Sequence, residues 1–250
     1  MELLFDAGNT RLKWALVDSN DRIVEQGGVF YQNLKEDSFY SIKSSELSRV
    51  YVSSVAGEEK NDLISSLSEK VFGVQPKYAR VKGSALGMAN HYRDIDRLGV
   101  DRWVAAMGVV GRVGINRIIV DAGTAVTIDA VSKKNEFLGG VILPGRDLMH
   151  RSLTGQTAEI SSEKINVHSV IGQITDECVN AGIQYGLTGA VSSILDEMDE
   201  NLSNGGSCEI VVCGGDGQWL FSNIQTSLKI TLEPNLIFQG LINLKNGGEV

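Results

Sequence analysis

Two related stretches of sequence constrain this chain most. Asp6-Ala7-Gly8-Asn9-Thr10 follows the apolar run Leu3-Leu4-Phe5, and Asp121-Ala122-Gly123-Thr124-Ala125 follows Ile118-Ile119-Val120. Apolar runs of this kind are typical of buried central strands, so each stretch predicts an aspartate where a strand gives way to a turn. One such turn is common in ordinary hairpins. Two copies 115 residues apart, with similar flanks, indicate an internal duplication.

The residue types in these turns are suited to a polyphosphate and its metal ion. Each aspartate can hold a hydrated cation, and each glycine leaves no Cβ between the backbone and an approaching phosphate. Amide and hydroxyl donors to the phosphate oxygens come from Asn9, Thr10 and Thr124. A third glycine-rich strand end, Gly214-Gly215-Asp216-Gly217, is suited to lie against an adenosine. The three turns together predict a nucleotide site.

The residues after the first turn alternate in polarity. Leu12, Trp14 and Leu16 share one face, whereas Arg11 and Lys13 share the other, as in the second arm of a hairpin. Lys13 either reaches a bound nucleotide or lies on a solvated strand face.

Length and charge narrow the class of protein. The chain has 250 residues, so the duplication predicts two halves, residues 1–113 and 114–250, packed tightly around a cleft. A net charge of −8 disfavours nucleic acid as the principal partner, although an anionic ligand can still be held locally. Three cysteines without a Cys-x-x-Cys pair indicate neither a disulfide framework nor a zinc site. Strand-like sequence from Leu3 onward, without a basic leader or a long apolar run, predicts neither secretion nor membrane insertion, and hence a cytoplasmic protein.

Periodicity predicts the remaining elements. The long helix contains Gly182, Gly186 and Gly189, which we expect to pack closely against another element or another subunit, because glycine inside a helix costs about 1 kcal/mol relative to alanine. Helices are expected over residues 58–72, 101–110 and 175–201, strands over 50–55, 115–121, 126–131, 137–145 and 209–213, and a loop over 83–97.

The motifs, taken in order, resemble those of type III pantothenate kinases over essentially the whole length. That family belongs to the superfamily of acetate and sugar kinases, heat-shock ATPases and actin. The motifs are Asp6-x-Gly-Asn-Thr with Lys13, Gly99-x-Asp101-Arg102, Asp121-x-Gly-Thr-Ala with Thr127 and Asp129, Gly139-Gly140-x-Ile142-x-Pro144-Gly145, Thr157-Ala158, and Gly214-Gly215-Asp216. The resemblance implies an α/β fold of two duplicated ribonuclease H-like (actin-like ATPase) halves with a nucleotide cleft between them.

The resemblance also implies an activity and a set of roles. The activity is the ATP-dependent phosphorylation of pantothenate to 4'-phosphopantothenate, the first step of coenzyme A biosynthesis, in a homodimer that needs Mg²⁺ and a monovalent cation, K⁺ or NH₄⁺. Asp101 matches the proton acceptor, and Asp121 matches the ligand of the monovalent cation. The implied ATP contacts are Asp6, Ala7, Gly8, Asn9, Thr10, Arg11, Leu12, Lys13 and Thr124, and the implied pantothenate contacts are Tyr92, Gly99, Val100, Arg102 and Thr175.

Simpler structural interpretations stand beside these roles. Asp101 can be an aspartate at a helix N-terminus, Asp121 a strand-end cap and Tyr92 a core aromatic residue. The three histidines lack metal-ligand spacing, which predicts that each is exposed or hydrogen-bonded; Arg146, His150 and Arg151 either meet an anion or form a solvated basic turn.

Two departures from the family pattern and one different function complete the sequence analysis. Glu159-Ile160-Ser161 stands where relatives commonly carry Leu-Pro, and Cys178 stands where a small residue is common. The alternative function is a nucleotide-gated regulatory or binding protein of the same fold, which the presence of Asp101 and Arg102 disfavours.

Overall fold

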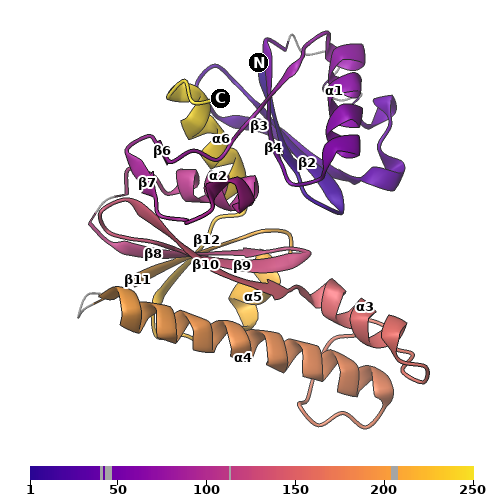
Figure 1. Cartoon of the computed structure of the whole chain (residues 1–250). Helices are drawn as coiled ribbons and strands as arrows, with labels where there is room; N and C mark the ends of the chain where they lie inside the picture. Colours follow the sequence, from indigo (N-terminus) through magenta and orange to yellow (C-terminus); the bar gives the residue numbers. More distant parts are fainter. Residues whose placement is uncertain (40–41, 43–46, 113, 204–207) are drawn as a thin grey trace. The chain divides into compact units, whose positions relative to one another are not determined.

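The computed structural model describes the chain apart from residues 40–41, 43–46, 113 and 204–207, and it contains two compact units (Figure 1). Each unit is an α/β structure built on a mixed sheet. Unit 1 comprises Met1–Val113, Asn135–Phe137 and Asn235–Val250, and unit 2 comprises Gly114–Lys134 and Leu138–Pro234.

The sheet of unit 1 has the strand order β3-β2-β1-β4-β5, with β1 in the centre. β1 pairs antiparallel with β2 and parallel with β4. Leu3, Leu4 and Phe5 are all buried, as expected for a strand covered on both faces. The strands are β1 (Glu2–Ala7), β2 (Arg11–Val17), β3 (Ile23–Phe30), β4 (Arg49–Ser54) and β5 (Pro76–Tyr78).

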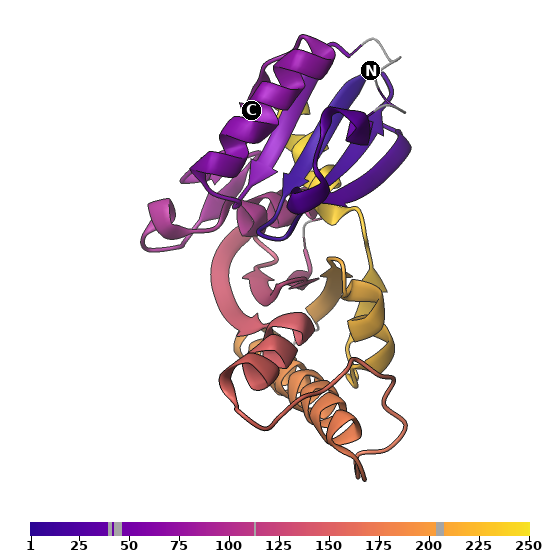
Figure 2. The ribbon, with the colours of Figure 1, turned by 90° about the vertical axis from the view of Figure 1, so that its right-hand side faces the viewer.

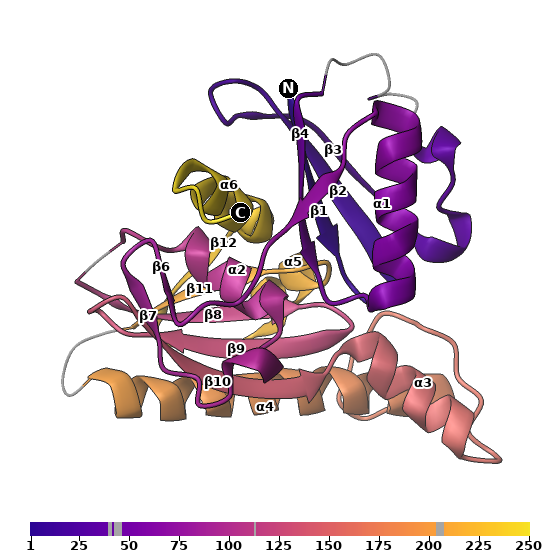
Figure 3. The same cartoon turned by 45° about the horizontal axis from the view of Figure 1, so that its top comes forward.

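Helices cover this sheet (Figure 3). α1 (Glu58–Phe72) packs through Ile64 on one face and ends at Gly73, whose left-handed backbone lets its N–H donate to the Glu69 carbonyl. α2 (Val100–Gly108) and α6 (Leu236–Asn246) pack closely against each other. Glycine at position 240 permits this, since an added Cβ there would lie 1.9 Å from the Val104 carbonyl oxygen. This contact explains why residues 235–250 group with unit 1.

The sheet of unit 2 repeats the order of unit 1. Its strands run β10-β9-β8-β11-β12, and the central β8 again has an antiparallel neighbour, β9, and a parallel neighbour, β11. Glu136 and Phe137, the first residues of β10, pair with β7 inside unit 1. The strands are β8 (Asn116–Ala122), β9 (Ala125–Val131), β10 (Glu136–Pro144), β11 (Cys208–Cys213) and β12 (Lys229–Leu232).

One long helix supplies much of the core of unit 2. α4 (Thr175–Ser203) lies along one face of the sheet and buries Leu187, Val191 and Leu195 against it (Figures 1 and 2). α3 (Arg146–Gln156) packs against α4, and α5 (Gly217–Asn223) connects β11 to β12. The shared strand order and the neighbours described below confirm the predicted fold class, an α/β chain of two duplicated ribonuclease H-like halves. The boundaries of those halves, 1–113 and 114–250, stay a prediction.

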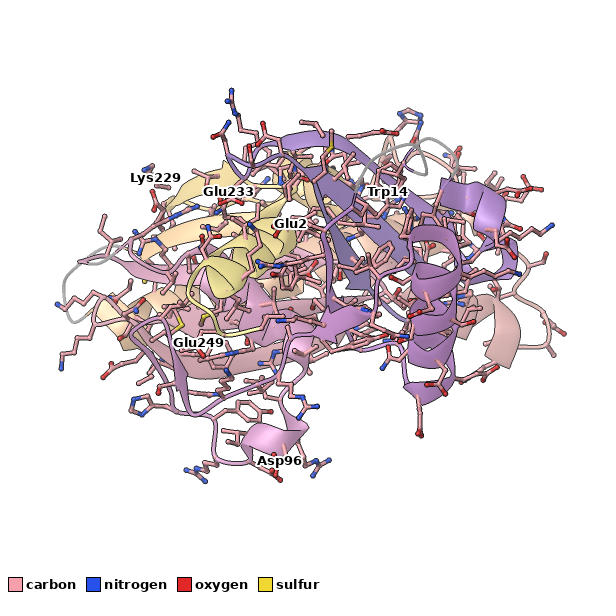
Figure 4. The ribbon with its side chains drawn as sticks, turned by 90° about the horizontal axis from the view of Figure 1, so that it is seen from above. Glu2, Trp14, Asp96, Lys229, Glu233 and Glu249 are labelled. Carbon is pink, nitrogen blue, oxygen red and sulfur yellow. The ribbon has the colours of Figure 1, made fainter. Side chains whose placement is uncertain are left out.

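The expected loop over residues 83–97 contains short regular elements. These are β6 (Ser84–Ala85), β7 (Met88–Asn90) and the 3-10 turn η3 (Ile95–Arg97). Asp96 lies on η3, as Figure 4 shows. Two further 3-10 turns are η1 (Tyr31–Asn33) and η2 (Glu36–Phe39).

Three sequence-based points have structural outcomes. Apart from the backbone of α4 itself, an added Cβ on Gly182, Gly186 or Gly189 would meet no atom of the described residues within 4 Å. Packing against another element of this chain is therefore the wrong explanation for these glycines, and packing against another subunit stays a prediction. The three cysteines are all described, and none forms a disulfide. Among the described residues, no helix combines the length and apolar character needed to cross a bilayer.

Candidate active site

The first predicted phosphate turn lies between β1 and β2. Asp6 is the penultimate residue of β1 and pairs in register with Lys13 of β2. The Lys13 Nζ lies 3.3 Å from the Asp6 Oδ2, and both side chains are partly exposed. Lys13 is therefore paired with the aspartate of the turn and is not purely solvated, and its contact with a phosphate stays a prediction.

The side chains of this turn differ in what they can offer a ligand. Ala7 and Leu12 are about 99% buried in the core, so they can contact a ligand only through their backbone. Asn9, Thr10 and Arg11 are exposed. The Arg11 guanidinium lies 4.8 Å from the centre of the Phe30 ring on the neighbouring strand.

Two further residues contact this turn, and the sequence analysis missed both. The Lys60 Nζ donates a hydrogen bond of 2.7 Å to the Asn9 carbonyl oxygen and lies 4.7 Å from the centre of the Tyr31 ring. The Tyr31 hydroxyl is buried without a hydrogen-bond partner among the described residues. Burial, together with the negative charge of Asp6, raises the pKa of Tyr31 to about 12. The phenol therefore stays protonated at neutral pH.

The predicted proton acceptor lies in the first turn of α2. The Asp101 Oδ1 accepts a hydrogen bond of 2.8 Å from the backbone N–H of Arg102. This bond fixes the orientation of the carboxylate at the start of the helix. An added Cβ on Gly99 would lie 2.6 Å from the same oxygen, so glycine at position 99 leaves the space that the carboxylate occupies.

The predicted pantothenate residues of unit 1 lie at the start of α2 or against the Arg102 side chain. Arg102 is 5% exposed, and its guanidinium lies 5.5 Å from the centre of the Tyr92 ring. The backbone N–H of Tyr92 is held by the Asn90 side chain at 3.0 Å. Gly99 precedes α2, and Val100 begins it. Tyr92 is partly exposed beside Arg102 and is therefore not a core residue, and its contact with pantothenate stays a prediction.

The second predicted phosphate turn lies between β8 and β9 and is one residue shorter than the first. Asp121 is the penultimate residue of β8, and it pairs with Thr127 of β9 and with Cys213 of β11. The Gly123 N–H donates to the Ala125 carbonyl at 2.9 Å, which closes the turn. Thr124 is partly exposed.

Two glycine-containing loops pack directly on this second turn. The Gly145 N–H donates to the Thr124 carbonyl at 3.0 Å, and an added Cβ on Gly145 would lie 2.1 Å from the Gly123 carbonyl oxygen. Gly214 has a φ of +92°, and an added Cβ there would lie 2.3 Å from both the Asp121 Oδ1 and the Ala122 carbonyl oxygen. The two oxygens thus converge beside Gly214, where only glycine leaves room.

The donor set suits hard cations that keep other ligands. Among the described residues, no three His, Cys, Asp or Glu side chains gather as metal ligands. Mg²⁺ in kinases is commonly held by one or two carboxylates together with substrate phosphates, so a single carboxylate such as Asp6 fits it. Asp121 supplies one carboxylate to the second turn, whereas the Ala122 carbonyl oxygen accepts a hydrogen bond of 2.8 Å from the Asp216 N–H.

The remaining predicted residues belong to unit 2. Thr175 is the exposed first residue of α4, and with Ile174, Cys178 and Leu153 it lines a cavity of about 560 Å³.

The basic residues after Pro144-Gly145 lie on helix α3, not in a turn. The Arg146 guanidinium lies 4.0 Å from the centre of the Trp219 ring, and the Arg151 Nε donates to the Asp147 carbonyl at 3.3 Å. His150 is 8% exposed, and its Nε2 has no partner among the described residues. The expectation that each histidine is exposed or hydrogen-bonded is therefore wrong for His150, because the packing of α3 encloses it.

Comparisons with known proteins give this geometry a family. The family model for type III pantothenate kinase matches residues 2–197. The chain belongs to the type III pantothenate kinase family. A type III pantothenate kinase from a Polaromonas species is 33% identical over 257 residues and covers 97% of this chain and 96% of the relative. One from Alcanivorax borkumensis is 31% identical and covers 96% and 97% of the two chains. The predicted family, and with it the prediction of an enzyme that is a kinase, is confirmed.

Solved structures of low sequence identity share the fold. A Baf family transcriptional activator from Campylobacter jejuni matches with a TM-score of 0.61 at 19% identity, over 99% of this chain and 100% of that chain. The activator of 2-hydroxyisocaproyl-CoA dehydratase from Clostridium difficile, solved with bound ADPNP, matches with a TM-score of 0.53 at 13% identity, over 100% and 97%.

Proposed function

We propose that this pantothenate kinase transfers the γ-phosphoryl group of ATP to the primary hydroxyl of pantothenate and releases ADP and 4'-phosphopantothenate. The observation that carries the proposal is the family match over residues 2–197, which includes both phosphate turns and the Asp101 segment. The product enters coenzyme A biosynthesis, of which this reaction is the first step.

Asp101 is the proposed proton acceptor. Its carboxylate is fixed by the Arg102 N–H, so it is already oriented before substrate binds. During transfer, the bond between the pantothenate oxygen and the γ-phosphorus forms, the bond from that phosphorus to the β–γ bridging oxygen breaks, and the hydroxyl proton passes to Asp101. Because the transition state is loose, positioning and charge stabilisation contribute most, and the proton can move late.

Both units are proposed to contribute to ATP binding. In unit 1 the donors are the side chains of Asn9 and Thr10 and the backbone of residues 6–13, with Lys13 as a cation for the phosphates. In unit 2 the donor is Thr124, and the loop at Gly214 lies against the adenosine. Asp6 would hold Mg²⁺, and Asp121 would hold the monovalent cation, K⁺ or NH₄⁺. Bound there, such cations would supply positive charge opposite the phosphates.

Pantothenate is proposed to bind beside Asp101, with Tyr92, Gly99, Val100 and Arg102 as its contacts. Arg102 is a suitable partner for the carboxylate of pantothenate, because a guanidinium presents paired donors to a carboxylate. Thr175 contributes from unit 2. We further propose a cytoplasmic homodimer, in which the open glycine face of α4 and the exposed apolar residues near its start meet the second copy.

The test is release of ADP by the purified protein with and without pantothenate, in potassium and in sodium buffer. The proposal predicts turnover that requires pantothenate. Asp101→Asn is expected to lower that turnover by at least about 100-fold, the lower range for a positioned acid or base, with an unchanged melting temperature. ATP binding without turnover on pantothenate would instead indicate a nucleotide-gated regulatory protein. Near-normal turnover of the variant would remove Asp101 from its role.

A further inference from the structure

The first turn of α1 lies beside the phosphate turn of unit 1 because of strand register. β1 and β4 are parallel neighbours, and Ala7 pairs with Ser54, so both strands end at the same edge of the sheet. The Val55 N–H donates to the Ala7 carbonyl at 3.0 Å, which continues the pairing one step beyond the strand end. The chain then turns at Gly57, whose φ is +89°, and enters α1.

This path of the chain from β4 into α1 brings Lys60 to the turn between β1 and β2. Its Nζ donates to the Asn9 carbonyl at 2.7 Å, and the centre of the Tyr31 ring lies 4.7 Å from the Nζ. The Lys60 side chain is partly buried. An ammonium group has three donors, so these two contacts leave it able to bind a further acceptor.

Lys60 and Lys13 differ in how their charges are paired. Lys13, the other lysine of the turn, lies 3.3 Å from the Asp6 carboxylate. No acidic side chain among the described residues forms an ion pair with Lys60. Although Glu58 and Glu59 share the first turn of α1 with Lys60, the Lys60 ammonium is not ion-paired with any described residue and can attract an anion.

The hydrogen bond to Asn9 also fixes the direction of a donor. In a trans peptide the C=O and N–H groups of one planar unit point in opposite directions. Lys60 holds the carbonyl of the peptide between Asn9 and Thr10. It thereby sets the direction of the Thr10 N–H, a backbone donor inside the phosphate turn.

We propose that Lys60 is a positioning residue for the triphosphate of ATP, which holds the peptide between Asn9 and Thr10 in its binding orientation and adds a positive charge to the turn. The proposal rests on the proposed binding of ATP at this turn. It assigns a role to a residue outside the Asp6–Lys13 motif.

The experiment compares the wild-type protein with Lys60→Met, Lys60→Arg and a control, Lys70→Met. Lys70 lies on the same helix, exposed and paired with Glu36. Affinity for a non-hydrolysable ATP analogue with Mg²⁺ is measured by calorimetry, KM for pantothenate by ADP release, and stability by thermal melting.

Lys60→Met is expected to weaken binding of the analogue about tenfold, the loss of one charge-assisted hydrogen bond. KM for pantothenate and the melting temperature are expected to match those of Lys70→Met. Lys60→Arg should restore most of the affinity, because it keeps the charge and the donors.

Two results would overturn the inference. One is analogue binding by Lys60→Met that equals binding by Lys70→Met. The other is a loss shared equally by the analogue and pantothenate and accompanied by a lower melting temperature, which would show a structural role only. If the wild-type protein binds the analogue but does not phosphorylate pantothenate, the proposed substrate fails while the binding comparison still decides the role of Lys60.

Discussion

Replacing Gly99 by alanine tests how tightly the Asp101 carboxylate is placed. Gly99 has a φ of −57° and a ψ of 129°, a conformation that alanine adopts without strain. The added Cβ would lie 2.6 Å from the Asp101 Oδ1, whereas ordinary contact begins at 3.4 Å. The oxygen must therefore move by about 0.8 Å, and this movement disturbs its 2.8 Å hydrogen bond from the Arg102 N–H.

The cost is expected in turnover more than in stability. A misplacement near 1 Å can cost on the order of 100-fold in rate, so kcat should fall between about 10-fold and 100-fold. The free energy of unfolding should change by less than about 1 kcal/mol, because the site is partly exposed and one hydrogen bond weakens.

The assay is ADP release at saturating ATP and pantothenate, together with urea unfolding. Gly83→Ala is the matched control, because Gly83 lies in the same unit, has an ordinary φ and has no neighbour within 4 Å of an added Cβ. If the effect acts through Asp101, adding Gly99→Ala to the Asp101→Asn variant should lower kcat little further. A kcat for Gly99→Ala equal to that of the control, or full additivity in the double variant, would refute the reasoning.

Two further predictions concern a cation site and stability. Asp121→Ala should abolish stimulation of turnover by potassium, and an unchanged ratio of rates in potassium and sodium would argue against the assignment. Lys245, whose side chain is 8% exposed, pairs with Glu2 at 2.8 Å and with Asp21. Lys245→Met should lower the free energy of unfolding by about 2 kcal/mol, since among the described residues Glu2 keeps only Arg49 at 3.7 Å and Asp21 keeps only the neutral Asn246 amide at 2.7 Å. Burial alone would raise the pKa of Asp21 and lower that of Lys245. The hydrogen bonds of the cluster outweigh burial, so the pKa of Asp21 lies below 3.8 and that of Lys245 above 10.5. The stability that this cluster contributes should therefore decrease as pH falls below 3.8 and as pH rises above 10.5. The urea midpoint of unfolding should decrease less in these two pH ranges for Lys245→Met than for the wild-type protein. Parallel midpoint curves for the two proteins would contradict this.

The sequence predicted the elements whose signals are local. The helix over 58–72 and the long helix from Thr175 were expected from apolar spacing, and the structure has them at Glu58–Phe72 and Thr175–Ser203. The central strands were readable because three consecutive apolar residues precede each turn aspartate. The family motifs were readable because they lie at strand ends and helix starts, where chemistry requires particular residue types.

Elements that depend on a neighbour were not predicted. β3 contains Gly27 and Gly28, which weaken a strand signal, yet an added Cβ on Gly27 would lie 2.7 Å from the indole of Trp14 on β2. Gly27 leaves the space that the Trp14 indole occupies, and this relation follows only from the pairing of β2 with β3. α3 was interpreted as a turn because Pro144-Gly145 precedes it, although Gly145 serves as its N-cap.

Lys60 escaped the sequence analysis for a similar reason. It lies 47 residues beyond Lys13, and no motif links it to the turn. Only the parallel pairing of β1 with β4 brings the start of α1 to Asn9. If the pairing of β1 with β4 is assumed, the sequence predicts that a lysine in the first turn of α1 lies near the phosphate turn.

The central claim is that the two related turns bind the same ATP. Hydrogen exchange measured by mass spectrometry, on peptides that cover residues 5–13 and 121–127, tests it most directly. A non-hydrolysable ATP analogue with Mg²⁺ should slow exchange in both segments with the same dependence on concentration. Protection of one segment alone at saturation would contradict the account.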